Sequence, residues 1–197
     1  VVGCWLAEPT LRTMTMTSFH HVPVLFEDVV ELLAPTPDAH LVDCTVGGGS
    51  HAHALASQLG PHGTLLALDQ DPDALAAAGE RLAGLACRTL LRRANFVDLP
   101  KLLQELPEFG PIDVLLADLG VSSPQLDRPE RGFSFAADGP LDMRMAQEGP
   151  SVADLLGTLE SEELAEILRK GDVPRAHRFA QAILQAFHVG QMQSTQQ

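Results

Sequence analysis

The stretch LVDCTVGGGSH at residues 41–51 decides the fold, because an apolar run passes directly into three glycines. This order is typical of a buried strand that turns into a helix, since glycine lets the backbone turn and approach a ligand closely. Further apolar runs follow at residues 64–68, 89–92 and 112–117. Helical patterns separate them at residues 51–59, 73–85 and 98–106. Right-handed crossovers between such strands predict an α/β fold with a doubly wound, mostly parallel sheet.

The chain is predicted to divide into four parts around this sheet. These are a disordered tail over residues 1–19, a core over 20–145 that opens with a helix at 27–33, a helical subdomain over 146–190, and a frayed end over 191–197. Met14 or Met16 is the expected working start. Residues 120–150 are rich in Gly, Pro, Ser and Asp, and a loop of that length inside a compact domain indicates a functional segment.

The helical subdomain is expected to contain three helices. Their apolar patterns lie at residues 152–156, 162–168 and 176–187. Ser151 and Ser161 are the expected N-caps, because a serine hydroxyl accepts hydrogen bonds from the free amides of the first helical turn.

Composition excludes several classes of protein. The 197 residues are 45% hydrophobic and 20% charged, which is typical of a soluble globular protein. A formal net charge of -13 excludes a generally basic surface for nucleic acid or an anionic membrane. No apolar run approaches the roughly 18 residues of a membrane span, and no signal peptide is visible, so we expect a cytoplasmic protein without membrane contact. Cys4, Cys44 and Cys87 are interpreted as free thiols, with Cys44 buried, and no metal site is expected.

A nucleoside-bearing cofactor is expected at the ends of the strands. Asp69 lies twenty residues after Gly49, at the end of the second apolar run, where its carboxylate can accept hydrogen bonds from ribose hydroxyls. NAD and S-adenosylmethionine sites share this acid, and the loop satisfies only the relaxed pattern G-x-G-x-x-A, with Ala52 last. Asp43, before the glycines, favours S-adenosylmethionine, whose ammonium group a carboxylate can satisfy. A tight strand-to-helix turn without a ligand is the plainer alternative.

A second group of motifs follows the fourth apolar run. The segments are LADLGVSSPQLD at residues 116–127, PERGFSF at 129–135 and DGPLDMRM at 138–145. With HVPVL at 21–25, DCTVGGGSH at 43–51 and LDQDPDAL at 68–75, they resemble the ribosomal small-subunit RNA cytosine-N4 methyltransferases. The resemblance runs from about residue 20 to residue 184.

The resemblance implies a class I, Rossmann-like fold and transfer of a methyl group from S-adenosyl-L-methionine to N4 of a cytidine in 16S rRNA of the small ribosomal subunit. Asp118 is then the catalytic residue, accepting a hydrogen bond from the amino group, although it can also simply cap its loop. The implied cofactor-binding residues are Gly49, Ser50, His51, Asp69, Phe96, Asp118 and Gln125. Helices from about residue 145 to residue 187 correspond to an insert on the RNA side.

The sequence departs from the family pattern in three ways. Gly48 and Ser50 stand where many members have a basic residue and a glycine, and a tyrosine-glycine-acid-acid stretch is missing after Lys170. Family chains also continue with strands that complete the sheet. We therefore expect an exposed edge on the fourth strand, which makes this chain unstable, inactive or a homodimer through that surface.

Cationic side chains are candidates for RNA contact despite the acidic composition. Arg128, Arg131 and Arg144 lie among the loop motifs, and residues 169–178 contain five cationic or titratable basic side chains facing only Asp172. These five are Arg169, Lys170, Arg175, His177 and Arg178. A solvated helix face is the alternative. Phe133 and Phe135 are expected either to stack on the target base or to pack in the core. His20 and His21 are expected to be surface or substrate-side groups rather than metal ligands.

Two other functions remain open from the sequence. A non-catalytic fragment that binds S-adenosylmethionine or RNA without turnover fits the same motifs. An NAD-dependent oxidoreductase fits the glycine loop and Asp69, but it leaves residues 120–145 unexplained and lacks a dyad for hydride transfer.

Overall fold

The computed structural model describes residues 24–197, and the predicted tail, Cys4, His20 and His21 lie outside the described residues. The helices and strands are α1 (Phe26–Leu33), β1 (His40–Asp43), α2 (Ser50–Ala56), β2 (Thr64–Asp69), α3 (Pro72–Arg81), β3 (Arg88–Arg93), α4 (Leu99–Glu105), β4 (Val114–Leu116), α5 (Ser123–Asp127), α6 (Val152–Thr158), α7 (Ser161–Lys170) and α8 (Ala176–His188). Short 3₁₀ turns add η1 (Phe96–Asp98), η2 (Pro107–Phe109) and η3 (Pro129–Arg131). Every strand predicted from an apolar run is present.

The four strands form one parallel sheet in the order β3-β2-β1-β4. Leu41 of β1 lies opposite Leu65 of β2 on one side and Val114 of β4 on the other. The chain builds outward from β1 to β3 and then crosses back to place β4 on the free side of β1. This confirms the doubly wound α/β fold, and it puts the topological switch point between β1 and β4, where such sheets bind ligands.

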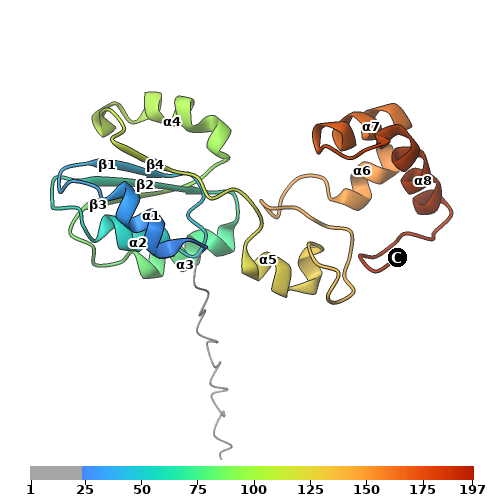
Figure 1. Ribbon diagram of the computed structural model, residues 1–197, viewed down its shortest axis with the longest axis horizontal. Helices are drawn as coiled ribbons and strands as arrows, with labels where there is room; N and C mark the ends of the chain where they lie inside the picture. Colours follow the sequence, from blue (N-terminus) through green and yellow to red (C-terminus); the bar gives the residue numbers. More distant parts are fainter. Residues whose placement is uncertain (1–23) are drawn as a thin grey trace, which may run out of the picture.

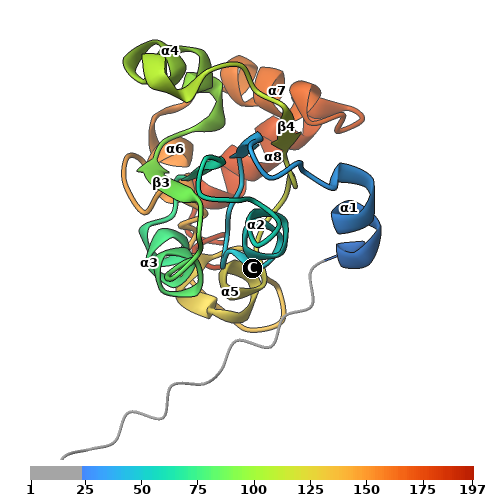
Figure 2. The same cartoon turned by 90° about the vertical axis from the view of Figure 1, so that its left-hand side faces the viewer.

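The two faces of the sheet are covered by different helices. Leu41, Leu65 and Ala67 point into a buried cluster with α2 and α3, against which α1 also packs. Val42 and Leu66 point the other way, into a cluster covered by α4. Figure 1 shows α4 on one side of the sheet and α1, α2 and α3 on the other, and Figure 2 shows the same layers from the end of the molecule. The two central strands, β1 and β2, are buried on both faces, which explains why their sequences lack alternation.

The edge of the sheet at β4 is open, as expected. β4 is short and pairs only with β1 among the described strands, and the Leu115 side chain on it is 48% exposed. The homodimer through this edge stays a prediction. No helix in residues 24–197 is long and apolar enough to cross a membrane. Cys44 and Cys87 are buried free thiols, which confirms the prediction for these two.

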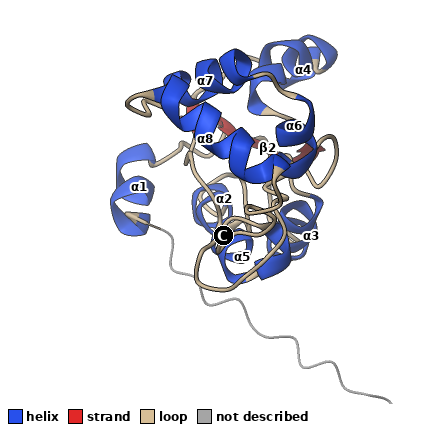
Figure 3. Cartoon of the chain, turned by 90° about the vertical axis from the view of Figure 1, so that its right-hand side faces the viewer, coloured by secondary structure: helices blue, strands red, loops and turns tan. Residues whose placement is uncertain are grey.

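Helices α6, α7 and α8 have a hydrophobic core of their own. Its fully buried members are Leu156, Leu164, Ala165, Ala180 and Leu184. Figures 1 and 3 show the three helices together, and Figure 1 shows them apart from the sheet and joined to it by a long connection. Ser151 caps α6 through reciprocal hydrogen bonds with Asp154, as predicted. The predicted cap at Ser161 is wrong, because Glu160 and Glu163 form the capping box of α7.

The end of the chain differs from the frayed segment expected over residues 191–197. Ser194 forms an antiparallel bridge with Pro140, and the Thr195 amide donates a hydrogen bond of 2.9 Å to the Gly139 carbonyl. The Thr195 hydroxyl in turn accepts from the Gly139 amide at 3.1 Å. Polar side chains that looked like a tail thus satisfy backbone groups of the loop.

Candidate functional site

Three acids lie at the carboxyl ends of adjacent strands. Asp43 and Asp69 are the last residues of β1 and β2, and Asp118 follows β4 closely. The loops after these strands are tied together by hydrogen bonds. The Asp118 amide donates to the Thr45 hydroxyl at 2.8 Å, and the Gly47 amide donates to Asp69 Oδ2 at 2.9 Å. The structure therefore brings two predicted site residues, Asp69 and Asp118, to the same edge.

The electrostatics of this edge are unbalanced. Asp43 is 1% exposed, and burial, opposed by a hydrogen bond from the Thr45 amide and reinforced by the charges of Asp69 and Asp118, raises its pKa to about 7. None of the three acids forms an ion pair within residues 24–197. The edge thus carries negative charge without a protein cation opposite it.

The glycine loop gives access to this edge. Gly47 and Gly49 have φ of +50° and +79°, a conformation that favours glycine. A Cβ on Gly49 would lie 3.2 Å from Ala78 Cα of α3, so this glycine also permits close packing of α2 on α3. A Cβ on Gly48 would meet nothing within 4 Å. The backbone at Gly48 is therefore open to a ligand.

Ser50 and His51 begin α2 directly after the loop. The Ser50 hydroxyl accepts a hydrogen bond of 2.5 Å from Arg81 of α3. The His51 ring is buried and stacks on Phe26 at 5.4 Å between centroids, and its Nε2 atom has no hydrogen-bond partner within the described residues. Burial lowers the pKa of His51, and the nearby charge of Asp118 only partly opposes this. A neutral imidazole with one unused nitrogen therefore borders the acidic edge.

Phe96 lies just beyond β3, the strand next to β2. Its side chain is 39% exposed at the start of η1. The preceding Asn95 donates a hydrogen bond of 3.2 Å to the side chain of Gln70, which follows Asp69. This contact ties the two strand ends together and leaves an accessible aromatic ring beside them.

Gln125 lies in α5, where its polar atoms are engaged within the protein. Oε1 accepts from the Ser122 amide at 3.0 Å, and Nε2 donates to Asp71 Oδ2 at 3.2 Å. The side chain is 6% exposed. Its predicted contact with a cofactor stays a prediction, and the contacts seen here hold the loop after β4 against the end of β2.

Sequence reasoning missed Asp71, which collects contacts from three segments. Its carboxylate accepts from Arg131 Nη1 at 2.7 Å, from Gln147 Nε2 at 2.8 Å and from the Asp73 amide at 3.0 Å. Burial raises the pKa of Asp71, but these hydrogen bonds and that from Gln125 outweigh it and hold the pKa below its ordinary value. The available signal was an acid directly before Pro72, which is typical of a helix N-cap and says nothing of distant partners.

Comparison with known proteins identifies the family to which this chain belongs. The model of the MraW methylase family matches residues 18–197. The chain belongs to the MraW methylase family. This confirms the resemblance carried by the strand-end and loop motifs.

Relatives of this family member are similar over most of the chain. Proteins named ribosomal RNA small subunit methyltransferase H are 47% identical in Heliobacterium modesticaldum, over 84% of this chain and 54% of the relative, and 46% identical in Syntrophotalea carbinolica, over 86% and 54%. The Myxococcus xanthus protein of that name is 45% identical over 88% of this chain and 55% of its own. The chain thus spans about half the length of these relatives.

In this member of the MraW methylase family, the loop arginines do not form a free positive patch. Arg128 pairs with Asp73 at 2.7 Å, Arg131 with Asp71 at 2.7 Å, and Arg144 with Asp142 at 2.6 Å. Each guanidinium is thus already paired with an acid, and RNA contact by these three stays a prediction. Phe133 lies beside Arg131, with 6.0 Å from the guanidinium carbon to the ring centroid, and Phe135 is 84% exposed. Phe135 is therefore outside the core.

Among residues 24–197, no group of three or more His, Cys, Asp or Glu side chains is arranged to hold a metal ion.

Proposed function

We propose that this chain methylates the N4 amino group of a cytidine in 16S rRNA, using S-adenosyl-L-methionine. The observation that carries the proposal is the group of Asp43, Asp69 and Asp118 beside an open glycine loop, without a cation opposite them in the described chain. Membership of the MraW methylase family and the names of the relatives support the reaction class and the substrate.

The residues at this edge fit S-adenosylmethionine better than NAD. The methyl donor carries a sulfonium and an ammonium group, both of which carboxylates attract, whereas the pyrophosphate of NAD would face like charge. In the proposed complex, Asp69 accepts from the ribose and Phe96 contacts the adenine. The loop residues Gly49, Ser50 and His51 border the ligand, and Asp118 and Gln125 lie toward its methionine part.

The chemistry needs alignment more than a strong base, because the lone pair of a cytosine amino group is delocalised into the ring. When bound, S-adenosylmethionine would supply the methyl group to N4, the C–S electron pair staying on sulfur and one N4 proton passing to solvent. The exposed carboxylate of Asp118 accepts a hydrogen bond from the amino group, which shifts electron density toward the nitrogen. The hydrogen bond that the Asp118 backbone amide donates to the Thr45 hydroxyl fixes the position of this residue.

The target base must leave its stack to reach the end of β4, since the reacting atom is not accessible inside a helix. Phe135 presents an exposed ring in the segment that follows η3. In the proposed complex, this ring stacks on the extruded base. The helices α6, α7 and α8 then form the RNA side of the protein.

The test is transfer of labelled methyl to small ribosomal subunits that lack the modification. Label in N4-methylcytidine is expected with the natural chain, together with a loss of about 100-fold or more in Asp118→Asn, which keeps the shape of the side chain but removes the negative charge that strengthens the hydrogen bond from the amino group. Glu105→Gln is the matched control, because this exposed acid of α4 lies away from the strand ends. Equal rates in the two variants would contradict the role of Asp118.

A second candidate is a fragment that binds S-adenosylmethionine or RNA without turnover, which is favoured by the coverage of only about half of each relative. Measurable binding of S-adenosylmethionine without label transfer would support it. Binding of NADH but not of S-adenosylmethionine would contradict both candidates.

A further inference from the structure

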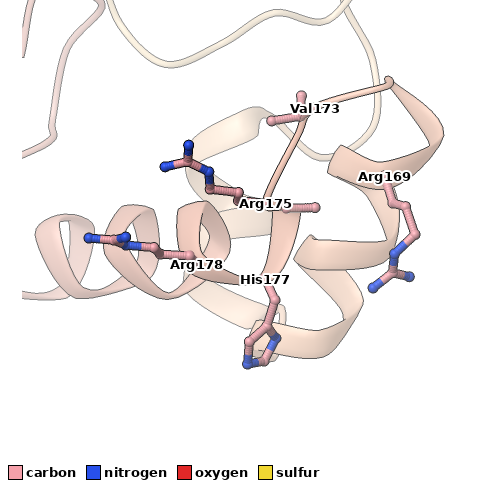
Figure 4. Close-up of a pocket in the computed structure, with 6 residues that line it drawn as sticks. Arg169, Val173, Arg175, His177 and Arg178 are labelled. Atoms are coloured by element: carbon pink, nitrogen blue, oxygen red, sulfur yellow. The ribbon is translucent and has the colours of Figure 1, made fainter.

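A cavity of about 550 Å³ opens at the turn between α7 and α8. Its lining consists of Arg169, Val173, Arg175, Ala176, His177 and Arg178 (Figure 4). It belongs to the helical subdomain and shares no residue with the strand-end site. In a chain with a net charge of -13, such a local gathering of basic side chains is unusual.

The charges around this cavity are not equivalent. Arg169 Nη2 lies 3.4 Å from Glu162 Oε1, and His177 Nδ1 lies 3.2 Å from Glu162 Oε2. Lys170 pairs with Glu166 at 3.1 Å. This corrects the expectation that the basic side chains of residues 169–178 face only Asp172, because glutamates one and two turns earlier on α7 neutralise several of them.

Arg175 and Arg178 remain without such partners. Neither forms an ion pair within residues 24–197, and both side chains are exposed. Figure 4 shows their guanidinium groups extended toward the same side, whereas Arg169 and His177 point elsewhere. Two unpaired guanidinium groups on one side of a cavity provide the donors that a phosphate oxygen requires.

The position of these arginines on α8 adds to the case. Arg175 is the N-cap residue of α8, and the first turn of this 13-residue helix contains no acid. The first turn of α7, in contrast, contains Glu162 and Glu163. Cations at a helix N-terminus are repelled by the positive end of the helix dipole, and the two guanidinium groups also repel each other. An anion bound there relieves both repulsions.

We propose that Arg175 and Arg178 bind a backbone phosphate of the RNA substrate. The proposal rests on the proposed function for the identity of the RNA, but not on methyl transfer. The adjacent Phe179 is 49% exposed at the same end of α8, and an aromatic ring beside phosphate-binding arginines is typical of sites for single-stranded nucleic acid rather than for a free anion.

The test is the affinity of the full chain for a labelled single-stranded RNA, measured by fluorescence anisotropy over a range of salt concentrations. The double variant Arg175→Gln/Arg178→Gln is expected to bind roughly 5-fold more weakly at about 0.1 M salt, with the salt slope reduced by about 0.7, because one neutralised phosphate on a single strand contributes about 0.7. Arg178→Gln alone should give about half of the change in slope, and it leaves the left-handed backbone at Arg175 untouched.

The matched control is Arg88→Gln/Arg92→Gln, which removes the same charge from exposed positions on β3. It is expected to keep the affinity within about twofold, because both positions lie on the sheet and not in the helical subdomain. The proposed site would be overturned by an equal loss of RNA affinity in both double variants, or by unchanged affinity in Arg175→Gln/Arg178→Gln. It would also be overturned if the natural chain did not bind RNA. Displacement of RNA by inorganic phosphate at constant ionic strength would identify a free-anion site and also overturn it. A failure of methyl transfer with the expected pattern of RNA affinities would contradict the proposed function alone.

Discussion

Asp71 and Arg131 form a buried ion pair across 60 residues of sequence, with Asp71 Oδ2 at 2.7 Å from Arg131 Nη1. Arg131 Nη2 also donates to the carbonyls of Arg144 and Met145, at 3.0 and 3.2 Å. The pair therefore joins the end of β2 to the loop that follows β4. Both parts border the strand-end site.

Breaking this pair should cost the fold considerably more than breaking an exposed pair. Arg131→Gln leaves the Asp71 carboxylate buried and unpaired, which is expected to lower the free energy of unfolding by about 3–5 kcal/mol. Arg128→Gln breaks the exposed pair with Asp73, for which about 1 kcal/mol or less is expected. Urea unfolding of both variants measures the difference, and equal losses would contradict the assigned role of burial.

The buried Asp43 carboxyl should make stability depend on pH. Its pKa of about 7 in the folded chain lies above its ordinary value of 3.8, so the folded state binds more protons between these values. The free energy of unfolding should therefore fall as the pH rises from about 4 to about 7. Asp43→Asn, which cannot ionise, should remove this slope and be the more stable protein at pH 8. The same slope in the variant would show that another group is responsible.

On the proposed function, binding of S-adenosylmethionine should release protons. A cationic ligand beside Asp43 stabilises the ionised carboxylate and lowers its pKa, so affinity is expected to rise with pH up to about 7. Calorimetric titration at pH 7 in buffers of different ionisation enthalpy measures the protons released. Asp43→Asn should release fewer protons on binding. An unchanged number of released protons would show that they come from another group.

Adjacent glycines of the loop should differ in their tolerance of a methyl group. Gly49→Ala combines a φ of +79° with a contact of 3.2 Å to Ala78 Cα, so it is expected to cost at least about 1–2 kcal/mol of stability. Gly48→Ala meets nothing within 4 Å and should change stability by about 0.5 kcal/mol or less. Thermal unfolding compares them, and a larger loss in Gly48→Ala would contradict the assignment.

The two serines before α6 and within α7 should also behave differently. Ser151→Ala removes the N-cap hydrogen bonds of α6 and is expected to cost about 1 kcal/mol. The Ser161 hydroxyl is buried without a hydrogen-bond partner in the described chain, so Ser161→Ala should be neutral or stabilising. Denaturant midpoints of the two variants test this, and a comparable loss in Ser161→Ala would restore it as a cap.

The parts of the fold that could be predicted are those that depend on local pattern. Apolar runs at regular spacing, separated by helical patterns, indicated all four strands, and parallel topology then required Asp69 and Asp118 to share an edge. The pair between Asp71 and Arg131 could not be predicted, because no spacing rule relates residues 60 positions apart. The pairing of Arg169 with Glu162 was missed because charge was counted along the chain rather than around the helix. Roles toward cofactor and RNA stay predictions.

The amide of Met143 donates to the Arg131 carbonyl at 3.1 Å, and so belongs to a segment that is anchored to the sheet although it has no regular structure. Its exchange with solvent deuterium should follow the opening of the β2 end rather than rapid fluctuation of a free loop. The loop and the sheet then form one cooperative unit. On the proposed function, the side that faces the RNA therefore cannot loosen without disturbing the side that holds S-adenosylmethionine.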